Sequence, residues 1–390
     1  MLALVVGSAP AATAGPTAID REVAAVLATA PVGEPLTVVT TTQTGNGPRF
    51  TSQRASSRSE ARDLIAAALS DRSTAGVGLD HPVSVADADA RHSSKRANDT
   101  LRDRQWGLSR LQAEKVWRKS TGKEVVVAVV DSGVSRHHPD LVGQVLKGHD
   151  FVADDDAPDD NNGHGTHVAG IIAATADNKR GMAGLASSAK ILPVRVLDAA
   201  GNGTTLTVAR GIAYAVRKGA NVINLSLTGD QQDPQVEAAV KYATDNDVVV
   251  IAAAGNQGCA GPTAYPAAYP GVIGVGALDR HGVVPSFSAC GDSVDIVAPG
   301  RQVISTMIKR PGAGLPCTRG RSYCFLDGTS MAAPHAAAAA AILIARTRFR
   351  LSAVEVGDIM RTSADDIGVP GVDPSSGAGA LNVRRMLTGR

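Results

Sequence analysis

The sequence predicts an α/β protein built on a mostly parallel sheet with helices on both faces, preceded by a small α/β unit. From Val125 onward, short runs of Val, Ile and Ala alternate with helical segments. Continuous apolar runs of this kind are typical of strands that are buried on both faces, as in parallel sheets. We expect strands at 125–130, 190–196, 222–227 and 248–253, and helices that begin near 164 and span 208–218 and 235–246.

Residues 15 to about 95 differ from the rest of the chain and are thinly hydrophobic. Leu36–Thr42 alternates like a strand, Ser57–Ser70 has helical periodicity, and Val77–Val85 has the composition of a further strand. These elements predict the small α/β unit. The basic stretch Ala90–Asn98 that follows predicts an exposed linker, where proteolytic nicking concentrates.

The bulk composition argues against two classes of partner. The net charge is only +2, with Lys and Arg mixed among Asp and Glu, so we expect no nucleic-acid binding. No apolar run reaches the ~18 residues that span a bilayer, so we expect no membrane span. We expect a monomer.

The N-terminus and the cysteines indicate export. A short apolar stretch precedes Ala12-Thr13-Ala14, an A-x-A-like cleavage site, although a basic n-region is lacking. We expect residues 1–14 to be a truncated signal peptide and the protein to be secreted, because disulfides persist in oxidising compartments. Four cysteines allow three connectivities. Pairing Cys317 with Cys324 would close a short loop and leave Cys259 with Cys290.

Three separate segments each carry one side chain suited to acyl transfer. Asp131 follows the first apolar strand, His164 lies between glycines in NGHGTHVAG, and Ser330 lies in GTSMAAPH before an alanine-rich helix. Taken singly, Asp131 is better explained as a turn residue and Ser330 as a helix N-cap. Together they supply a hydroxyl nucleophile, a base that takes its proton, and a carboxylate that orients the base.

These motifs, with VVDSG around Asp131, resemble the three signatures of the subtilisin-like serine proteases (subtilases), in the order Asp, His, Ser. The resemblance covers residues ~97–390. It implies a subtilisin-like catalytic domain at 96–390, a secreted serine endopeptidase that cuts proteins and peptides, and a triad of Asp131, His164 and Ser330. Asn256 in AAAGNQG resembles the oxyanion-hole asparagine of the family.

The resemblance further implies a self-processing zymogen. Residues 15–95 resemble the family's propeptide, a folding chaperone and intramolecular inhibitor, and we expect the cut near residues 92–98. Two alternatives remain open: a dedicated processing protease with a narrow substrate, and an inactive peptide-binding module on the same fold.

A substrate cleft is also implied by the resemblance. The segments that resemble its walls contain no acidic residue, so we expect a preference for apolar or medium-sized side chains. Thr228 stands where the family usually has Gly. The segment Ile308–Cys324 is longer than usual and predicts a surface loop. The implied residues are Ser226, Leu227, Thr228, Ala253 and Gly255 at the primary pocket, Ala264 near its floor, and Gly201, Asn202 and Gly203 at an edge that pairs with an extended substrate.

Calcium is the implied cofactor, because two groups of oxygen-bearing residues resemble calcium sites of the family. Calcium takes six to eight oxygen ligands from carboxylates and carbonyls. A strong site would use the side chains of Asp99, Asp140 and Asn178 and the carbonyls of Thr175, Arg180 and Met182. A second site would lie in Asp150–Asp160, where eleven residues hold six carboxylates. Its ligands would be Asp150, Asp155, Asp159 and the Ala157 carbonyl, and a solvated loop is the alternative.

Overall fold

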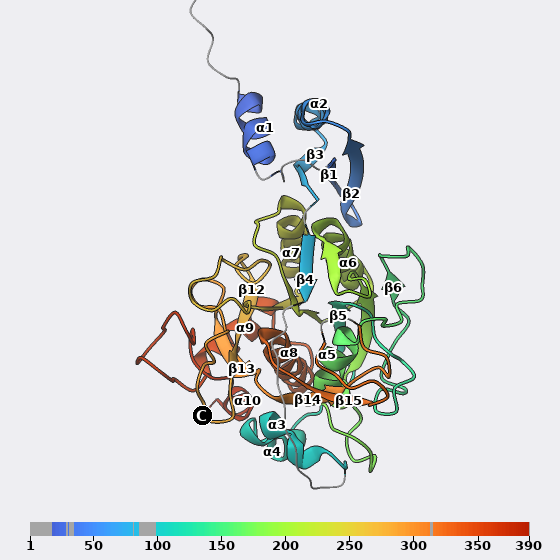
Figure 1. Cartoon of the computed structure of the whole chain (residues 1–390). Coiled ribbons are helices and arrows are strands. Elements are labelled where there is room, and N and C mark those ends of the chain that lie inside the picture. The colour runs from blue at the N-terminus through green and yellow to red at the C-terminus, as the bar shows by residue number, and fades with distance from the viewer. Residues whose placement is uncertain are drawn as a thin grey trace, which may run out of the picture.

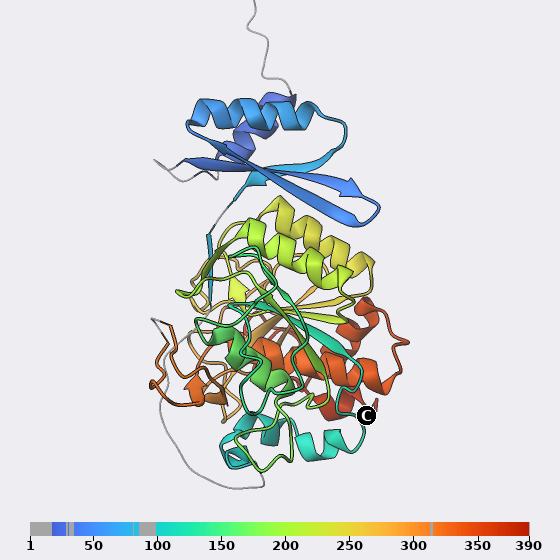
Figure 2. The ribbon, with the colours of Figure 1, turned by 90° about the vertical axis from the view of Figure 1, so that its right-hand side faces the viewer.

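The computed structural model describes residues 18–28, 30, 35–80, 82–85, 99–312 and 315–389. It has two units: the smaller, N-terminal one lies above the larger one in Figures 1 and 2, over the helices α6 (Thr205–Arg217) and α7 (Pro234–Asp245). Among the described residues, no helix is long and apolar enough to cross a membrane. The expected signal segment, residues 1–14, lies outside the described part of the chain.

The small unit is an antiparallel sheet with two helices on one face. Its strands β1 (Leu36–Thr44), β2 (Gly47–Ala55) and β3 (Thr74–Leu79) are ordered β2-β1-β3. The helices α1 (Ala18–Ala28) and α2 (Arg58–Ser70) cover the face that points away from the larger unit (Figure 2). Their apolar sides enclose a small core of Val, Leu, Ile and Ala side chains. The expected strand at 36–42 and helix at 57–70 are therefore present.

The expected strand at 77–85 is wrong as a single element. It is interrupted after Leu79, and the second part forms β4 (Pro82–Val85), which leaves the small unit. This strand lies between β8 (Asn202–Thr204) and β10 (Leu227–Thr228) of the larger unit, antiparallel to both. The reason is a long-range contact of Asp80, described below, which residue periodicity does not report.

A seven-stranded sheet in which every strand pair is parallel forms the centre of the larger unit, in the order β13-β12-β11-β9-β5-β7-β6. The fold class expected from the sequence is confirmed. The strands are β5 (Val126–Asp131), β6 (His149–Asp150), β7 (Lys190–Arg195), β9 (Val222–Leu225), β11 (Val249–Ala253), β12 (Val272–Leu278) and β13 (Ile296–Pro299).

Alternate residues of one strand enter two different cores, because successive side chains of a strand point to opposite faces. Val127 and Val129 pack with α5 (His164–Ala173) and α8 (Thr329–Arg346), whereas Ala128 and Val130 pack with α6 and α7. Both faces of the sheet are thus covered.

The remaining elements are η1 (Arg102–Arg104), α3 (Trp106–Arg110), α4 (Ala113–Trp117), β14 (Val303–Thr306), β15 (Tyr323–Leu326), α9 (Ala353–Thr362) and α10 (Val383–Met386).

Helix α8 is buried along most of its length. Every residue from Ala336 to Ala341 is fully shielded from solvent, and the helix packs against α5 and the strands β11 and β12. Alanine side chains allow this because they let a helix approach its neighbours closely without leaving voids. The helix therefore carries Ser330 on a rigid, fully packed support.

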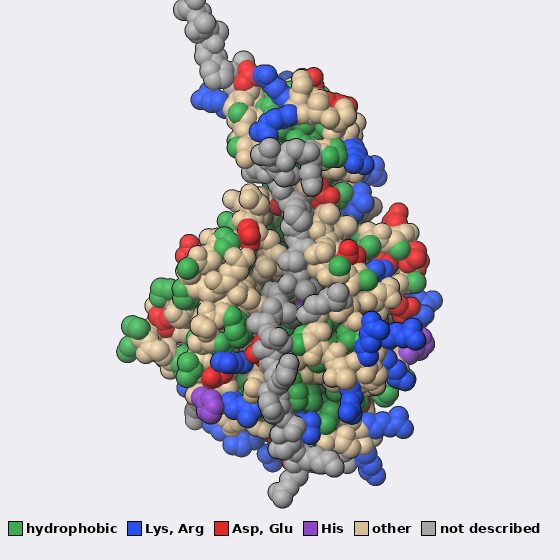
Figure 3. Space-filling view, in the orientation of Figure 1, with side chains coloured by type: hydrophobic (Ala, Val, Ile, Leu, Met, Phe, Trp, Pro, Cys, Tyr) green, Lys and Arg blue, Asp and Glu red, His purple; other side chains and the backbone are tan. Residues whose placement is uncertain are grey.

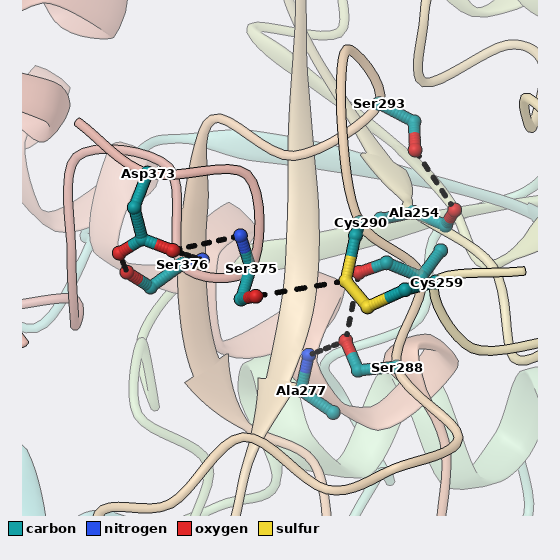
Figure 4. The surroundings of a disulfide bond; sticks show 10 residues. Ala254, Cys259, Ala277, Ser288, Cys290, Ser293, Asp373, Ser375 and Ser376 are labelled. Atoms are coloured by element: carbon teal, nitrogen blue, oxygen red, sulfur yellow. Dashed lines mark hydrogen bonds between the residues drawn. A yellow bond between two sulfur atoms is a disulfide. The ribbon is translucent and has the colours of Figure 1, made fainter. Parts of the chain in front are cut away.

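Both disulfides join the cysteines as expected, Cys317 with Cys324 and Cys259 with Cys290. Figure 4 shows the second one beside the C-terminal turn that contains Ser375, whose hydroxyl lies 3.7 Å from Cys290 Sγ. This disulfide attaches the segment that directly follows Asn256 to the loop after Phe287. The Gly258 N–H donates to the Phe287 carbonyl and strengthens the same attachment.

Candidate active site

The sheet brings the predicted reactive residues to one edge. Asp131 ends β5, Ser226 directly follows β9, and Asn256 follows β11 by three residues. These three strands are neighbours, in the order β11-β9-β5. Since they are parallel, their carboxyl ends meet at the edge where ligands of such sheets bind.

Asp131 holds the imidazole of His164. His164 Nδ1 lies 2.8 Å from Asp131 Oδ1 and 2.9 Å from Oδ2, and both side chains are fully buried. The carboxylate is an acceptor, so the proton of the neutral ring lies on Nδ1 and leaves Nε2 as the basic nitrogen. Asp131 Oδ1 also accepts from the Ser132 N–H at 2.7 Å, which fixes the carboxylate.

Glycines flank His164 because the backbone there has no room for side chains. A Cβ on Gly165 would lie 2.1 Å from the Gly133 carbonyl and 3.1 Å from the Asp131 side chain. Gly163, the N-cap of α5, has φ +113°, a left-handed conformation that favours glycine. The motif around His164 is therefore explained by the close approach of α5 to the end of β5.

Asp160 supports the same helix start, a role that the sequence did not reveal. Its Oδ1 accepts from the N–H groups of Asn162 and Gly163, and its Oδ2 accepts from the Thr166 N–H and hydroxyl. Burial raises the pKa of this carboxyl, and the hydrogen bonds oppose the rise. No separate signal marks Asp160 in the sequence, because it is the last of six carboxylates in the acidic segment.

Ser330 lies in the first turn of α8, where backbone N–H groups lack helical partners. Its hydroxyl donates to the Ser226 carbonyl at 3.0 Å, and the Ser226 hydroxyl donates back to the Ser330 carbonyl at 2.9 Å. The serine is therefore tied to the strand-end segment 226–228. His335, in the same motif, has a different place: burial lowers its pKa to about 4, and its Nδ1 lies 2.8 Å from the Met331 carbonyl.

Asn256 presents a side-chain NH2 group that can donate to a ligand. Its Oδ1 accepts from the Thr329 N–H at 2.9 Å and from the Thr329 hydroxyl at 3.0 Å. Its Nδ2 is buried and has no hydrogen-bond partner among the described residues. Thr329 therefore fixes the orientation of the amide. Because Thr329 directly precedes Ser330, these hydrogen bonds connect Asn256 to the segment that carries Ser330.

The two predicted edges of a substrate cleft lie on either side of β4. Thr228 pairs with Ser84 and Leu227 with Val85 on one side, while Gly203 pairs with Val83 on the other. Asn202 pairs with Ser84, and Gly201 precedes this edge in a turn. The chain's own segment Pro82–Val85 thus occupies the space between the predicted edges as an added strand.

The predicted pocket residues lie next to one another at the end of β11. Ala253 ends the strand, and a Cβ on Gly255 would lie 3.2 Å from Ala264 Cβ. Ala253, Gly255 and Ala264 are all buried. Ala264 precedes the cis peptide bond Tyr265-Pro266, whose tyrosine pairs with Gly229 beyond Thr228.

Contacts of the small unit with α6 and α7 are a second feature that sequence patterns missed. Asp80 Oδ1 accepts from the Leu206 N–H at 2.9 Å, so a carboxylate of the small unit caps the start of α6. Gln235 Nε2 donates to the Val39 carbonyl at 3.3 Å. Burial raises the pKa of Asp233, the N-cap of α7, to about 6, and the negative charge of Asp80 adds to the rise.

The residues of the expected strong calcium site come together. Asn178 Nδ2 donates to Asp140 Oδ1 at 2.9 Å, and the Asn178 N–H donates to Asp99 Oδ1 at 3.0 Å. Asp140 Oδ2 accepts from the Met182 N–H and, unforeseen, from the Tyr323 hydroxyl. Thr175 and Arg180 belong to the same loop: the Thr175 N–H donates to the Asp140 carbonyl and the Arg180 N–H to Asn178 Oδ1.

The acidic segment is arranged differently from a cluster around one ion. Asp150 Oδ2 lies 2.5 Å from Arg195 Nη1, so an arginine already neutralises its most buried carboxylate. Asp155 forms a bridge with Asp150, but Asp155, Ala157 and Asp159 are exposed. Within the described residues, no group of three or more His, Cys, Asp and Glu side chains is arranged to hold a metal ion.

Comparison with known proteins identifies the family. Residues 122–379 match the subtilase family. The chain belongs to this family. Its relatives include thermitase of Thermoactinomyces vulgaris, 43% identical over 69% of this chain and 91% of that protein, and subtilisin Savinase of Lederbergia lenta, 42% identical over 67% and 92%. The resemblance of the acidic segment to thermitase, inferred from its length and its DFV and Pro positions, agrees with this result.

A solved structure agrees with the fold of this subtilase. Fervidolysin of Fervidobacterium pennivorans, described as a keratinolytic enzyme related to subtilisin, matches with a TM-score of 0.80 and 29% identity. The match covers 93% of this chain and 62% of that one. This subtilase is accordingly a serine endopeptidase, which is a hydrolase.

Proposed function

We propose that this subtilase cleaves peptide bonds with Ser330 as nucleophile, His164 as general base and Asp131 as the group that orients the base. The observation that carries the proposal is the buried contact between His164 Nδ1 and the Asp131 carboxylate. The Ser330 hydroxyl attacks the scissile carbonyl while His164 Nε2 takes its proton. The same nitrogen then protonates the leaving amine, and water hydrolyses the acyl-enzyme by the reverse proton path.

The oxyanion of the tetrahedral intermediate would be bound by Asn256 Nδ2 and the Ser330 N–H. The buried, unpartnered Nδ2 supports this assignment, because a donor that already has a protein acceptor would gain little from the developing charge. The N-terminus of α8 adds a favourable partial positive charge at the same place. Both donors belong to packed elements, so little reorganisation is needed during the reaction.

The small unit acts, in this proposal, as a propeptide that inhibits the enzyme before maturation. Its strand β4 pairs with both cleft edges, and Asp80 caps α6. Val85 is opposite Leu227, and the preceding residue, Ser226, is bonded to Ser330. The register therefore favours a first cut directly after Ala86. This position is upstream of residues 92–98, where the linker composition predicts the cut. Residues 86–98 lie outside the described part of the chain, and the placement follows from the register of β4 and β10.

The substrate preference proposed from the pocket is for apolar or medium-sized side chains. The pocket residues Ala253, Gly255 and Ala264 are small and buried, and Thr228 adds a branched side chain at one edge. Secretion is supported by the two disulfides, which suit an oxidising compartment.

Digestion of casein by the purified protein tests the proposed function against both alternatives. We expect cleavage at many internal bonds, mostly after apolar or medium-sized residues, as mapped by mass spectrometry of the products. A single cleavage site would support the narrow processing protease. Binding of casein peptides without any hydrolysis would support the inactive peptide-binding module.

Calcium is proposed as a structural ligand of the Asp99–Asp140–Asn178 site. Asp99 and Asp140 are 3% and 0% exposed, and burying two neighbouring carboxylates is costly unless a cation is present. Burial raises the pKa of Asp99, hydrogen bonds from the N–H groups of Asp177 and Asn178 oppose the rise, and the negative charges of Asp177 and Asp140 add to it. Asp99 directly follows the proposed linker, so this site would hold the start of the catalytic domain.

Chelation is expected to lower the melting temperature. An ion that binds only the folded state stabilises it by about 2.7 kcal/mol at a hundredfold excess over Kd. Melting would be followed in the Ser330→Ala precursor, which is expected not to cut itself, with calcium and with chelator. Asp140→Ala should remove most of the difference, whereas Asp155→Ala, in the exposed acidic segment, serves as the matched control. Identical melting of the parent in both conditions would contradict the proposal.

A further inference from the structure

The insertion between β14 and β15 carries a concentrated positive charge. Ile308–Cys324 contains Lys309, Arg310, Arg319 and Arg321 and no acidic residue. All four side chains are exposed, and within the described part of the chain none of them takes part in an ion pair. In Figure 3, Lys and Arg side chains gather over the lower half of the larger unit, on the face that carries β4. Four positive charges without a negative one repel each other, so solvation of the loop does not by itself explain this composition.

The insertion packs directly against the catalytic side of the cleft. The Gly312 N–H donates to the Asn162 carbonyl at 2.6 Å, two residues before His164. A Cβ on Gly163 would meet Met307 Sδ at 2.5 Å and the side chains of Ile308 and Leu315 within 3.4 Å. At its other end the insertion continues through β15, which ends four residues before Ser330. The loop thus contacts the segment just before His164 and is connected through β15 to the segment that carries Ser330.

A groove runs along the outer side of this insertion. Its volume is about 710 Å³, and its described lining includes Arg104, Arg321, Tyr323 and Phe325 but no carboxylate. Asp327, between the groove and Ser330, is 4% exposed, accepts from the Gln302 N–H at 2.6 Å and lies 3.9 Å from Arg301. The charge of Asp327 is therefore already balanced, and the charged side chains in the described lining of the groove are the two arginines, Arg104 and Arg321.

The direction of β4 shows which half of a substrate meets the insertion. From Pro82 to Val85 the strand runs toward Ser226 and Ser330, so it occupies the half upstream of the scissile bond. A substrate that continues in this direction passes Ser330 next and meets the segment β15 and the insertion. The residues downstream of the scissile bond are therefore the ones exposed to the positive charge.

We propose that the insertion is a specificity element that favours acidic residues downstream of the scissile bond. The inference depends on the proposed function, since it takes the cleft beside Ser330 as the site of hydrolysis. The chain's own sequence agrees in charge: Ala86-Asp87-Ala88-Asp89 directly follows β4. The first physiological substrate of the cleft would thus be complementary to the loop that adjoins it.

Two quenched fluorescent peptides test this inference. They share the upstream half, and their downstream halves carry two Asp residues in one peptide and two Asn residues in the other. Exposed ion pairs contribute about two- to fivefold each, so we expect kcat/KM to be roughly tenfold higher for the Asp peptide at low ionic strength. The ratio should fall toward one in about 1 M salt, where charges are screened beyond ~3 Å.

Charge removal from the loop gives the second arm. The variant Lys309→Gln, Arg310→Gln, Arg319→Gln, Arg321→Gln should bring the ratio close to one and leave kcat/KM for the Asn peptide unchanged. The matched control replaces four exposed arginines, three at or just beyond the C-terminal end of α8 and one on α10. Arg346, at the end of α8, is about 24 Å from Ser330 along the helix axis. This control variant should keep the Asp-to-Asn ratio of kcat/KM of the parent. Its substitutions are Arg346→Gln, Arg348→Gln, Arg350→Gln and Arg384→Gln.

The outcomes separate this inference from the proposed function. If the parent hydrolyses both peptides equally at low salt, the loop does not select acidic residues, although the protease remains. If the loop variant keeps the preference, the charge that selects acidic residues lies elsewhere. Failure of the parent to hydrolyse either peptide would instead contradict the proposed function. The salt dependence of the parent decides the matter even if the loop variant does not fold.

Discussion

Replacing Ser330 with alanine is expected to reduce peptide hydrolysis about 10⁶-fold, the magnitude established for the nucleophile of subtilisin. Since self-processing is part of the proposed function, the same change should also leave the precursor uncut. In the proposed mechanism, removal of the hydroxyl deletes the atom that forms the acyl-enzyme, whereas His164 and Asp131 keep their contact. Rates with a chromogenic peptide and the mass of the purified precursor are the two measurements.

Ser293→Ala is a suitable control for this experiment. Ser293 is also buried and donates its hydroxyl to a backbone carbonyl, that of Ala254, at 3.3 Å. Loss of that bond should cost roughly 1 kcal/mol of stability and little activity. A trace of active enzyme added to the Ser330→Ala precursor should cut it close to Val85, which would prove that its cleavage site is intact. Normal maturation of the purified Ser330→Ala protein would rule out self-processing.

The sequence predicted the sheet, and it located the three candidate reactive residues, because both depend on local signals. Runs such as Val126–Val130 are apolar on both faces, and this is a property of the segment itself. Asp131, His164 and Ser330 lie at the ends of elements that periodicity can locate. Their meeting at one edge then follows from the parallel arrangement of β5, β9 and β11.

Contacts between distant segments were the part that the sequence did not predict. Residues 77–85 have the composition of one strand. The Asp80 carboxylate, however, accepts a hydrogen bond from the start of α6, 126 residues away, and at this point the chain leaves the small unit for the larger one. The resemblance to the family implies that Asp150 is a calcium ligand. In the fold, the parallel register of β6 and β7 places Arg195 opposite it, and the two side chains form an ion pair. Neither partner can be identified from a local pattern.

Asn256→Ala is expected to lower kcat by about 10²–10³-fold, the magnitude established for the corresponding donor in subtilisin. This equals about 2.7–4 kcal/mol of transition-state stabilisation. The effect should appear in kcat and leave KM nearly unchanged, because Nδ2 would meet negative charge only when the oxyanion forms. Steady-state kinetics with one chromogenic peptide separates the two constants.

Thr329 offers a graded control for this prediction, since its N–H and hydroxyl both donate to Asn256 Oδ1 and so orient the amide. Thr329→Val removes the hydroxyl that donates to Asn256 Oδ1 and accepts from the Gly255 N–H, but keeps the backbone donor. We expect a smaller loss of kcat than in Asn256→Ala, and Thr329→Ser should restore most of it. An Asn256→Ala enzyme with the kcat of the parent would mean that the unpartnered amide serves another purpose. A loss confined to KM would place Asn256 in substrate binding instead of oxyanion stabilisation.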